Sequence, residues 1–193
     1  HRLAMKDVSV KTNVKDMQQI IVPRKGVMEL VRLIDSASQE LEVHVSSNHI
    51  RFQIGHIRFT SKLIDGKFPD YERVIPQAAG NQLTADREVL RQSLNRASIL
   101  SNEKYRGVRI EVKENSLRAQ AQNPEQEEAE EEIAVQYEGE PIEIGFNVSY
   151  LLDAIGAIKT EQVRIILTDA NSSCLILPDD ETRCKYVVMP MRL

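Results

Sequence analysis

The chain has 193 residues, of which 41% are hydrophobic and 28% charged, and a formal net charge of −4 at pH 7. This composition is typical of a soluble protein with a buried core and argues against global disorder. No apolar run approaches the roughly 20 residues of a membrane-spanning helix. The negative charge argues against a nucleic-acid surface spread over the whole protein but leaves room for a local one.

The first residues have the pattern of a strand interior, and the chain begins with His1 rather than methionine. We therefore expect that residues upstream of His1 have been removed. No secretory signal is expected, since no long apolar core follows the first residue.

The first 70 residues predict an extended segment at 18–22, then one helix, then three strands. Pro23 suits the first position of a helix, and apolar residues follow it at helical spacing, at Val27, Leu30, Val31 and Ile34. Alternating apolar residues then predict antiparallel strands joined by tight turns, at residues 41–46, 50–54 and 57–63.

The same order of elements recurs twice more, with a period of roughly 60 residues. The second copy predicts a strand at 82–85, a helix at 86–100, and strands through 108–112, 117–121 and 133–137. The third predicts a strand at 142–146, a helix capped by Asn147, and strands at 163–167, 174–176 and 186–189.

Residues 65–76 contain a glycine and two prolines, which is typical of a domain boundary. We expect copies two and three to pair as one domain, at 71–193. Copy one, at 1–70, is expected to be half of a second domain.

Six stretches carry a family resemblance, and they occur in the family's order along the chain. They are residues 22–26, 65–71, 101–108, 123–131, 144–150 and 186–193. These stretches resemble the second half of the bacterial DNA sliding clamp, the beta subunit of DNA polymerase III.

The resemblance implies a DNA-clamp fold of class α+β, built from repeated strand-helix-strand-strand-strand half-domains. Antiparallel sheets would lie outside, and the helices would line a central hole for DNA. It implies a processivity factor of DNA replication, in which a homodimeric ring encircles duplex DNA and slides on it without sequence preference.

The implied protein partners are DNA polymerases, the clamp loader, mismatch-repair proteins and others that dock by short linear motifs. A non-catalytic subunit of the polymerase holoenzyme, in the bacterial cytoplasm at the replication fork, would need no cofactor and no membrane.

The densest run of charge lies between Glu125 and Glu132. A carboxylate-dependent nuclease or phosphotransferase would use such residues to bind Mg²⁺ or to transfer protons. Consecutive glutamates on a loop splay outward, however, which favours a solvated face. The resemblance implies a third role, a subunit interface made by Arg96, Ile99, Leu100, Glu125, Glu127, Glu128, Glu130 and Glu131.

The histidines do not show the spacing of a zinc site, so no metal is expected. His44 is predicted to face outward, and His49 and His56 to lie in turns. Cys174 and Cys184 would lie near each other across the last hairpin, and we expect them to be reduced thiols. The chain has no phosphate-binding glycine loop and no nucleophile elbow, so we do not expect it to catalyse the making or breaking of a covalent bond.

Two predicted helices carry basic residues within an acidic protein. Ordinary solvated faces are one reading of this pattern. The resemblance implies the other, contacts with DNA phosphates from Arg24, Lys25, Arg32, Arg87 and Arg91.

The chain's end is apolar nearly to its last residue, which fits either a final core strand or a partner surface. A scaffold that binds peptides but not DNA would share this feature. The resemblance implies a peptide-binding pocket formed by His1, Arg2, Leu3, Pro69, Arg73, Val74, Tyr105, Asn147, Tyr150, Ser173, Val187, Met189, Pro190 and Met191.

Overall fold

The computed structural model describes residues 1–34, 40–76, 80–180 and 183–192. The chain divides into two compact units, and each is described by itself. The smaller unit comprises Lys11–Asp70, and the larger comprises His1–Val10 together with Tyr71–Leu193.

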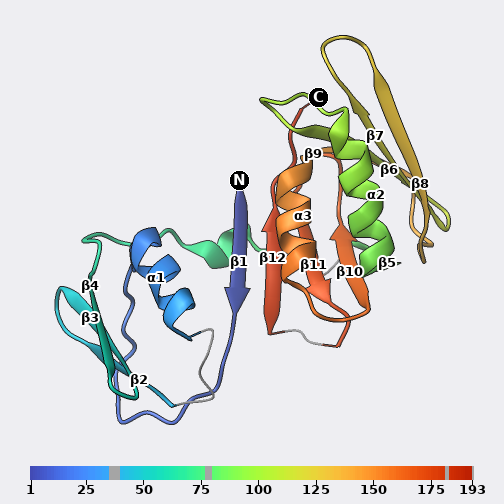
Figure 1. Cartoon of the computed structure of the whole chain (residues 1–193). Helices are drawn as coiled ribbons and strands as arrows, with labels where there is room; N and C mark the ends of the chain where they lie inside the picture. The colour runs from blue at the N-terminus through green and yellow to red at the C-terminus, as the bar shows by residue number, and fades with distance from the viewer. Residues whose placement is uncertain (35–39, 77–79, 181–182, 193) are drawn as a thin grey trace. The chain divides into compact units, whose positions relative to one another are not determined.

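The smaller unit contains one helix and a three-stranded antiparallel sheet of order β2-β3-β4 (Figure 1). Its elements are α1 (Arg24–Ile34), β2 (Leu41–Val45), β3 (His49–Ile54) and β4 (Ile57–Lys62). Alternation along β3 buries Ile50, Phe52 and Ile54 on one face, and the ring of Phe52 stacks on that of Phe59 with 6.2 Å between centroids. The order of the helix and the three strands agrees with the sequence prediction, except that His49 begins β3 instead of lying in a turn.

Two details of α1 differ from the prediction. The Pro23 carbonyl accepts a hydrogen bond from the Val27 N–H at 3.1 Å, so the helix begins one residue after Pro23. Along α1, all of which the structure describes, only Gly26 is buried. A Cβ on Gly26 would lie 2.7 Å from the Ser61 hydroxyl oxygen, so the helix crosses the sheet at the residue that lacks a side chain.

The predicted inward face of α1 is largely exposed: Val27 is 43% exposed and Val31 is 56% exposed. Strand β2 is exposed along its whole length as well. The smaller unit therefore leaves apolar side chains of both its helix and its sheet uncovered by the residues that the structure describes.

Residues 18–22, predicted to be extended as the first strand of the unit, are not part of any strand that the structure describes. A strand requires a ladder of backbone hydrogen bonds, and among the described residues this segment has a single one, from the Ile64 N–H to the Ile21 carbonyl at 2.9 Å. The apolar residues there suit a strand, but a strand also needs a partner strand beside it.

Over its described residues, the larger unit contains two antiparallel sheets and two α-helices, an α+β fold as predicted (Figure 1). The first sheet has the order β1-β12-β11-β10-β5 and the second the order β8-β7-β6-β9. Strands of the first sheet are β1 (Arg2–Lys6), β5 (Asn81–Asp86), β10 (Gln162–Leu167), β11 (Cys174–Pro178) and β12 (Cys184–Val188). Those of the second are β6 (Gly107–Lys113), β7 (Ser116–Gln122), β8 (Glu128–Ala134) and β9 (Ile142–Asn147).

Helices α2 (Arg87–Ile99) and α3 (Val148–Ala157) pack beside each other, and a short 3-10 helix, η1, spans Tyr71–Val74. Each α-helix follows directly on a strand and begins at a capping side chain. Leu90 and Leu94 of α2 are each 1% exposed and Ile155 of α3 is fully buried, in a core shared by both sheets. Both helices lie where the sequence predicted them, at 86–100 and directly after Asn147.

The last strand of the second copy lies earlier than predicted. It spans Glu128–Ala134, whereas alternation predicted a strand through Tyr137. Residues Val135 and Tyr137 are buried as expected, but Gln136 forms a separate bridge with Thr84 of β5. The chain leaves one sheet for the other after Ala134, and the apolar alternation continues across that change.

The two cysteines do not lie near each other. Cys174 pairs with Val188 across the β11–β12 ladder, whereas Cys184 is at the other end of β12, roughly 13 Å away at the rise of a strand. Both are free thiols, and burial raises the pKa of the Cys174 thiol to about 12. No helix among the described residues is long and apolar enough to cross a membrane.

Candidate functional site

The C-terminal strand carries the first group of predicted site residues. Strand β12 lies between β1 and β11, and its register places Val187 opposite Leu3. The Met189 N–H then donates to the His1 carbonyl at 2.9 Å, which continues the pairing past the end of the strand. The structure therefore brings His1, Leu3, Val187 and Met189 together.

A small apolar cluster surrounds Val187 on the five-stranded sheet, separate from the main core. Its buried members are Ile166, Leu175, Leu177 and Val187, with Leu3 and Ile75 packed against them. Ile75 directly follows η1, which contains the predicted residues Arg73 and Val74. Val187 is only 2% exposed, whereas Val74 and Met189 are each 41% exposed. Val74 and Met189 therefore expose apolar side chains next to a buried apolar cluster.

The start of α3 carries the second group. Asn147 ends β9 and caps α3, and its side-chain oxygen accepts from the N–H groups of Ser149 and Tyr150 at 3.0 and 3.3 Å. Its amide nitrogen donates to the Tyr105 carbonyl at 3.0 Å. One short polar side chain thus fixes the helix start and the loop that carries Tyr105.

Arg2 connects β1 to α3. Its guanidinium lies 4.4 Å from the centroid of the Tyr150 ring and forms an ion pair with Asp153 one turn later. Beyond Pro190, the Met191 N–H donates to the Gly145 carbonyl at 2.8 Å, which ties the tail to β9. Arg2, Tyr105, Asn147, Tyr150 and Met191 therefore all lie around the start of α3.

Two further predicted pocket residues lie outside these elements. Ser173 directly precedes β11, whose first residue, Cys174, pairs with Val188, and Pro69 belongs to the smaller unit. Sequence reasoning missed Ile75, Ile166, Leu175 and Leu177 of the apolar cluster. The continuous apolar run of β11 was the available signal, because a strand apolar on both faces is covered on both faces.

A cavity of about 630 Å³ lies next to the second group, on the larger unit. Tyr105 and Met191 of the predicted pocket line one part of it, and Glu128 and Glu130 of the acidic run line another. The apolar tail and the acidic strand therefore share one concave surface.

The acidic run lies mostly on a strand, not on a loop as predicted. Glu128, Glu130 and Glu132 alternate outward along β8 and are exposed. Glu131 has the opposite parity and accepts two hydrogen bonds from Arg96 of α2, at 2.8 and 2.6 Å. This pairing lowers the pKa of Glu131 and raises that of Arg96.

The remaining predicted interface residues lie at the end of α2, along β8 and in the turn before β8. Strand β8 is at the edge of its sheet, and Ile99 at the end of α2 is 76% exposed. Leu100, the C-cap residue, is half-buried, and Glu125 and Glu127 lie in the turn before β8. Within the described ranges, no three potential metal-ligating side chains converge.

The basic residues of α1 differ in their partners. Arg24 and Lys25 are exposed in the first turn, and among the described residues neither has an ion-pair partner. Arg32 makes one contact with Glu29, at 3.1 Å, and its side chain is 71% exposed. Positive charge on this helix is therefore open to solvent.

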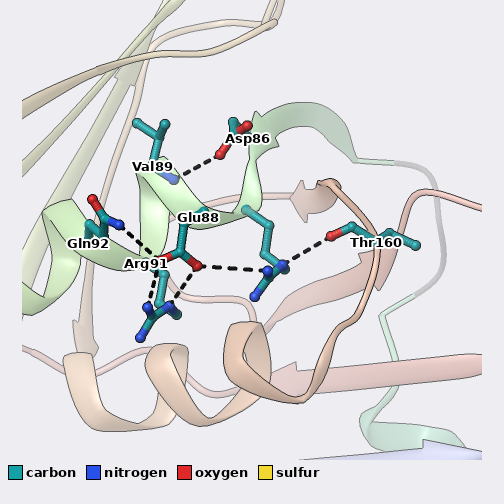
Figure 2. Close-up of polar contacts among 7 residues, drawn as sticks. Asp86, Glu88, Val89, Arg91, Gln92 and Thr160 are labelled. Carbon is teal, nitrogen blue, oxygen red and sulfur yellow. Dashed lines mark hydrogen bonds and ion pairs between the residues drawn. The ribbon is translucent and has the colours of Figure 1, made fainter.

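On α2, Arg91 is engaged with the carboxylate of Glu88, as Figure 2 shows. Arg91 donates to both oxygens of Glu88, at 3.0 and 2.6 Å, and Gln92 donates to the same carboxylate at 2.9 Å. Arg87 lies 3.7 Å from Glu88 and donates to the Thr160 carbonyl at 3.0 Å. The hydrogen bonds from Arg91 lower the pKa of Glu88 to about 2.

Comparison with known proteins covers the whole chain. Residues 72–192 match the family model of the DNA polymerase III beta subunit, C-terminal domain, and residues 1–70 match that of its central domain. Beta sliding clamps of Pseudomonas putida and Escherichia coli are 53% and 51% identical over all 193 residues, which cover 53% and 52% of those proteins.

Solved structures agree with the sequence comparisons. A crystal structure of the DNA polymerase sliding clamp of Pseudomonas aeruginosa with ligand has a TM-score of 0.97 at 53% identity. The Caulobacter crescentus pol III beta has a TM-score of 0.94 at 38% identity. The alignments cover 100% of this chain and 53% and 52% of those chains, so this chain spans about half the length of its relatives. The fold is thus the DNA-clamp fold, and the chain belongs to the family of bacterial DNA polymerase III beta subunits, the beta sliding clamps.

Proposed function

We propose that this chain acts in a processivity factor of bacterial DNA replication. In this proposal a two-subunit ring closes around duplex DNA, slides along it, and holds polymerases and other partners through short linear motifs. The observation that carries the proposal is the agreement with sliding clamps over the entire chain, at a TM-score of 0.97 and 53% identity. The protein would act in the cytoplasm as a non-catalytic subunit of the polymerase holoenzyme.

The proposed partner surface comprises those predicted pocket residues that lie in the larger unit, which are all of them except Pro69. Its support is that two elements far apart in sequence, β1 and β12, bring His1, Leu3 and Met189 to one place. A half-exposed methionine suits a groove that accepts many partners, since its side chain adapts to different shapes. Motifs with apolar anchors would bind there.

The proposed DNA contacts come from the exposed basic residues of α1, with a weaker contribution from α2. Lysine and arginine at phosphates give binding that is independent of sequence and weakens with salt. Arg24 and Lys25 suit this role because no carboxylate among the described residues neutralises them. A sliding ring benefits from such contacts, since each one is weak and quickly exchanged.

A charge reversal tests the DNA contacts. The variants are made in an intact subunit, meaning a protein of the relatives' length that contains these 193 residues. Arg24→Glu should lower the slope of log affinity against log salt by about one unit for a short duplex, measured by fluorescence anisotropy. Lys113→Glu, on the exposed face of β6, is the matched control. An unchanged slope for Arg24→Glu would remove α1 from the DNA surface.

A truncation of one side chain tests the partner surface. Met189→Ala should weaken binding of a polymerase-derived motif peptide by at least tenfold if Met189 is a binding hot spot. Met17→Ala, at a residue that is 99% exposed, controls for the loss of a methionine elsewhere. Equal affinity of both variants would exclude Met189 from the surface.

Retention on circular DNA separates a clamp from a scaffold that binds only peptides. An intact subunit loaded on closed circular DNA should stay bound and should be lost when the circle is cut. Equal loss from circular and linear DNA would contradict a ring.

A further inference from the structure

We propose that Glu88 weakens the binding of helix α2 to duplex DNA, because it holds the guanidinium of Arg91 in an ion pair. This inference rests on the proposed function. Arg91 then stays largely neutralised beside the DNA, and the contact from α2 is kept weak. Glu88 thereby sets how strongly α2 contacts the DNA phosphates.

Two hydrogen bonds join the side chains of Arg91 and Glu88 (Figure 2). Arg91 uses its Nε and Nη2 atoms on the two oxygens of Glu88, a bidentate arrangement that is more directional than a single ion pair. Gln92 and Arg87 approach the same carboxylate. Three side chains of one helix therefore converge on Glu88.

The pairing is short-range along the chain, so it forms within α2 itself. Glu88 and Arg91 are three residues apart on one helix, a spacing at which side chains are neighbours whatever else the protein binds. A phosphate that approached Arg91 would have to displace a carboxylate that is already in place. The three charged residues, Arg87, Glu88 and Arg91, thus present one net positive charge where two arginines would present two.

The helices of the repeat differ in this respect. On α1, Arg24 and Lys25 are without a carboxylate partner among the described residues, and Arg32 makes only one contact, with Glu29. On α2, both oxygens of Glu88 are used by Arg91. The repeated unit therefore presents its charge openly in one copy and restrains it in the next, so a change at Glu88 should act through α2 alone.

A purely structural role for Glu88 is the alternative. It lies in the first turn of α2, where a negative charge stabilises a helix, and its pair with Arg91 adds to that. Such a role predicts a loss of stability when the charge is removed and no change in DNA binding. The two roles therefore differ in what a neutral substitution does to the salt dependence.

Glu88→Gln in the intact subunit removes the charge and keeps the size of the side chain. Binding of a short duplex, measured by fluorescence anisotropy over a salt series, should become tighter. One freed phosphate contact should steepen the salt slope by about one unit, or about a fourfold larger loss of affinity between about 50 and about 200 mM salt. Adding Arg91→Ala to Glu88→Gln should abolish the gain.

Two controls decide the outcome. Glu143→Gln makes the same change of net charge on β9, where Glu143 pairs with Arg109 at 3.1 Å, and should leave the slope unchanged. An unchanged slope for Glu88→Gln, with the expected response of Arg24→Glu, overturns this inference and leaves the DNA surface standing. An equal gain in Glu143→Gln, or a gain that survives Arg91→Ala, overturns it as well. Unchanged slopes in both Arg24→Glu and Glu88→Gln overturn the proposed DNA surface and this inference together.

Discussion

Replacing Asn147 should affect both the stability of the larger unit and the candidate partner surface. Its side chain makes three hydrogen bonds: it accepts from Ser149 and Tyr150 at the start of α3 and donates to the Tyr105 carbonyl. Asn147→Ala removes all three bonds. The backbone there is extended, with φ of −75° and ψ of 115°, which alanine also adopts without strain.

The cost follows from these contacts. Loss of a helix N-cap side chain destabilises by about 1 kcal/mol, and loss of a further side-chain hydrogen bond costs about 1 kcal/mol. We expect the free energy of unfolding to fall by about 2 kcal/mol in total, or about 4–8 °C in Tm for a chain of this length. Urea unfolding followed by far-UV circular dichroism measures it.

Two variants separate the contributions. Asn147→Asp keeps an acceptor for the helix, and its charge favours the helix start, but it has no N–H for Tyr105. It should lose about 1 kcal/mol or less. Asp86→Ala removes the corresponding cap of α2, where the side chain accepts one hydrogen bond from the Val89 N–H at 2.8 Å, and should cost about 1 kcal/mol.

The same variants connect stability to the partner surface. Asn147 holds both the loop that carries Tyr105 and the turn that contains Tyr150. Asn147→Asp should therefore lower the free energy of motif-peptide binding by more than it lowers the free energy of unfolding. A free energy of unfolding for Asn147→Ala within about 0.5 kcal/mol of the parent would refute the cap's assigned contribution. Unchanged peptide affinity in both variants would separate Asn147 from the partner surface.

Three further outcomes are expected. Leu94→Ala empties a fully packed site of α2 and should lower the free energy of unfolding in urea by about 2–5 kcal/mol. Burial raises the pKa of the Cys174 thiol in the folded protein to about 12, so the unfolded chain loses this proton at a lower pH. The free energy of unfolding should therefore fall as pH rises above about 9. This part of the fall should vanish in Cys174→Ala. In an intact subunit, Ile99→Ala with Leu100→Ala should favour monomer over dimer by about 2 kcal/mol if these are hot spots; sedimentation in which the dimer persists unchanged would contradict the interface.

Most of the secondary structure could be predicted because its signals are local. Alternation along β3 and helical spacing along α2 depend only on which face is buried, and each was predicted within a few residues. The cap at Asn147 could be predicted for the same reason, since its residue type and its place before an apolar helix are both visible in sequence. Local physics decides these features, and tertiary packing reinforces them.

The failures involve partners that sequence alone does not show. Residues 18–22 have the composition of a strand, but a strand exists only where another strand pairs with it. Cys174 and Cys184 are separated because each begins its strand, and the first residues of two antiparallel strands lie at opposite ends of the ladder. The ion pair of Arg2 with Asp153 spans 151 positions, and nothing near either residue indicates it.

The candidate site was predicted in part from the resemblance and only in part from the residues themselves. The pairing of Glu88 with Arg91 was available from sequence, because a glutamate three residues before an arginine on a predicted helix is a standard i,i+3 pair. Reading the arginines as a basic face without their carboxylates overstated the open positive charge of α2. A basic helix face therefore has to be assessed together with the acidic residues one turn away.

Parity along β8 explains why one glutamate of the acidic run behaves unlike its neighbours. Side chains alternate across a strand, so Glu131 shares a face with Ala129 and the buried Ile133, while Glu130 and Glu132 share the other. A carboxylate on the core side requires a compensating partner, and Arg96 of α2 supplies both hydrogen bonds. A run that looks uniform in sequence is thus divided by the strand into exposed charges, which contact side chains of β7, and one internal contact that fixes α2 against the edge of the sheet.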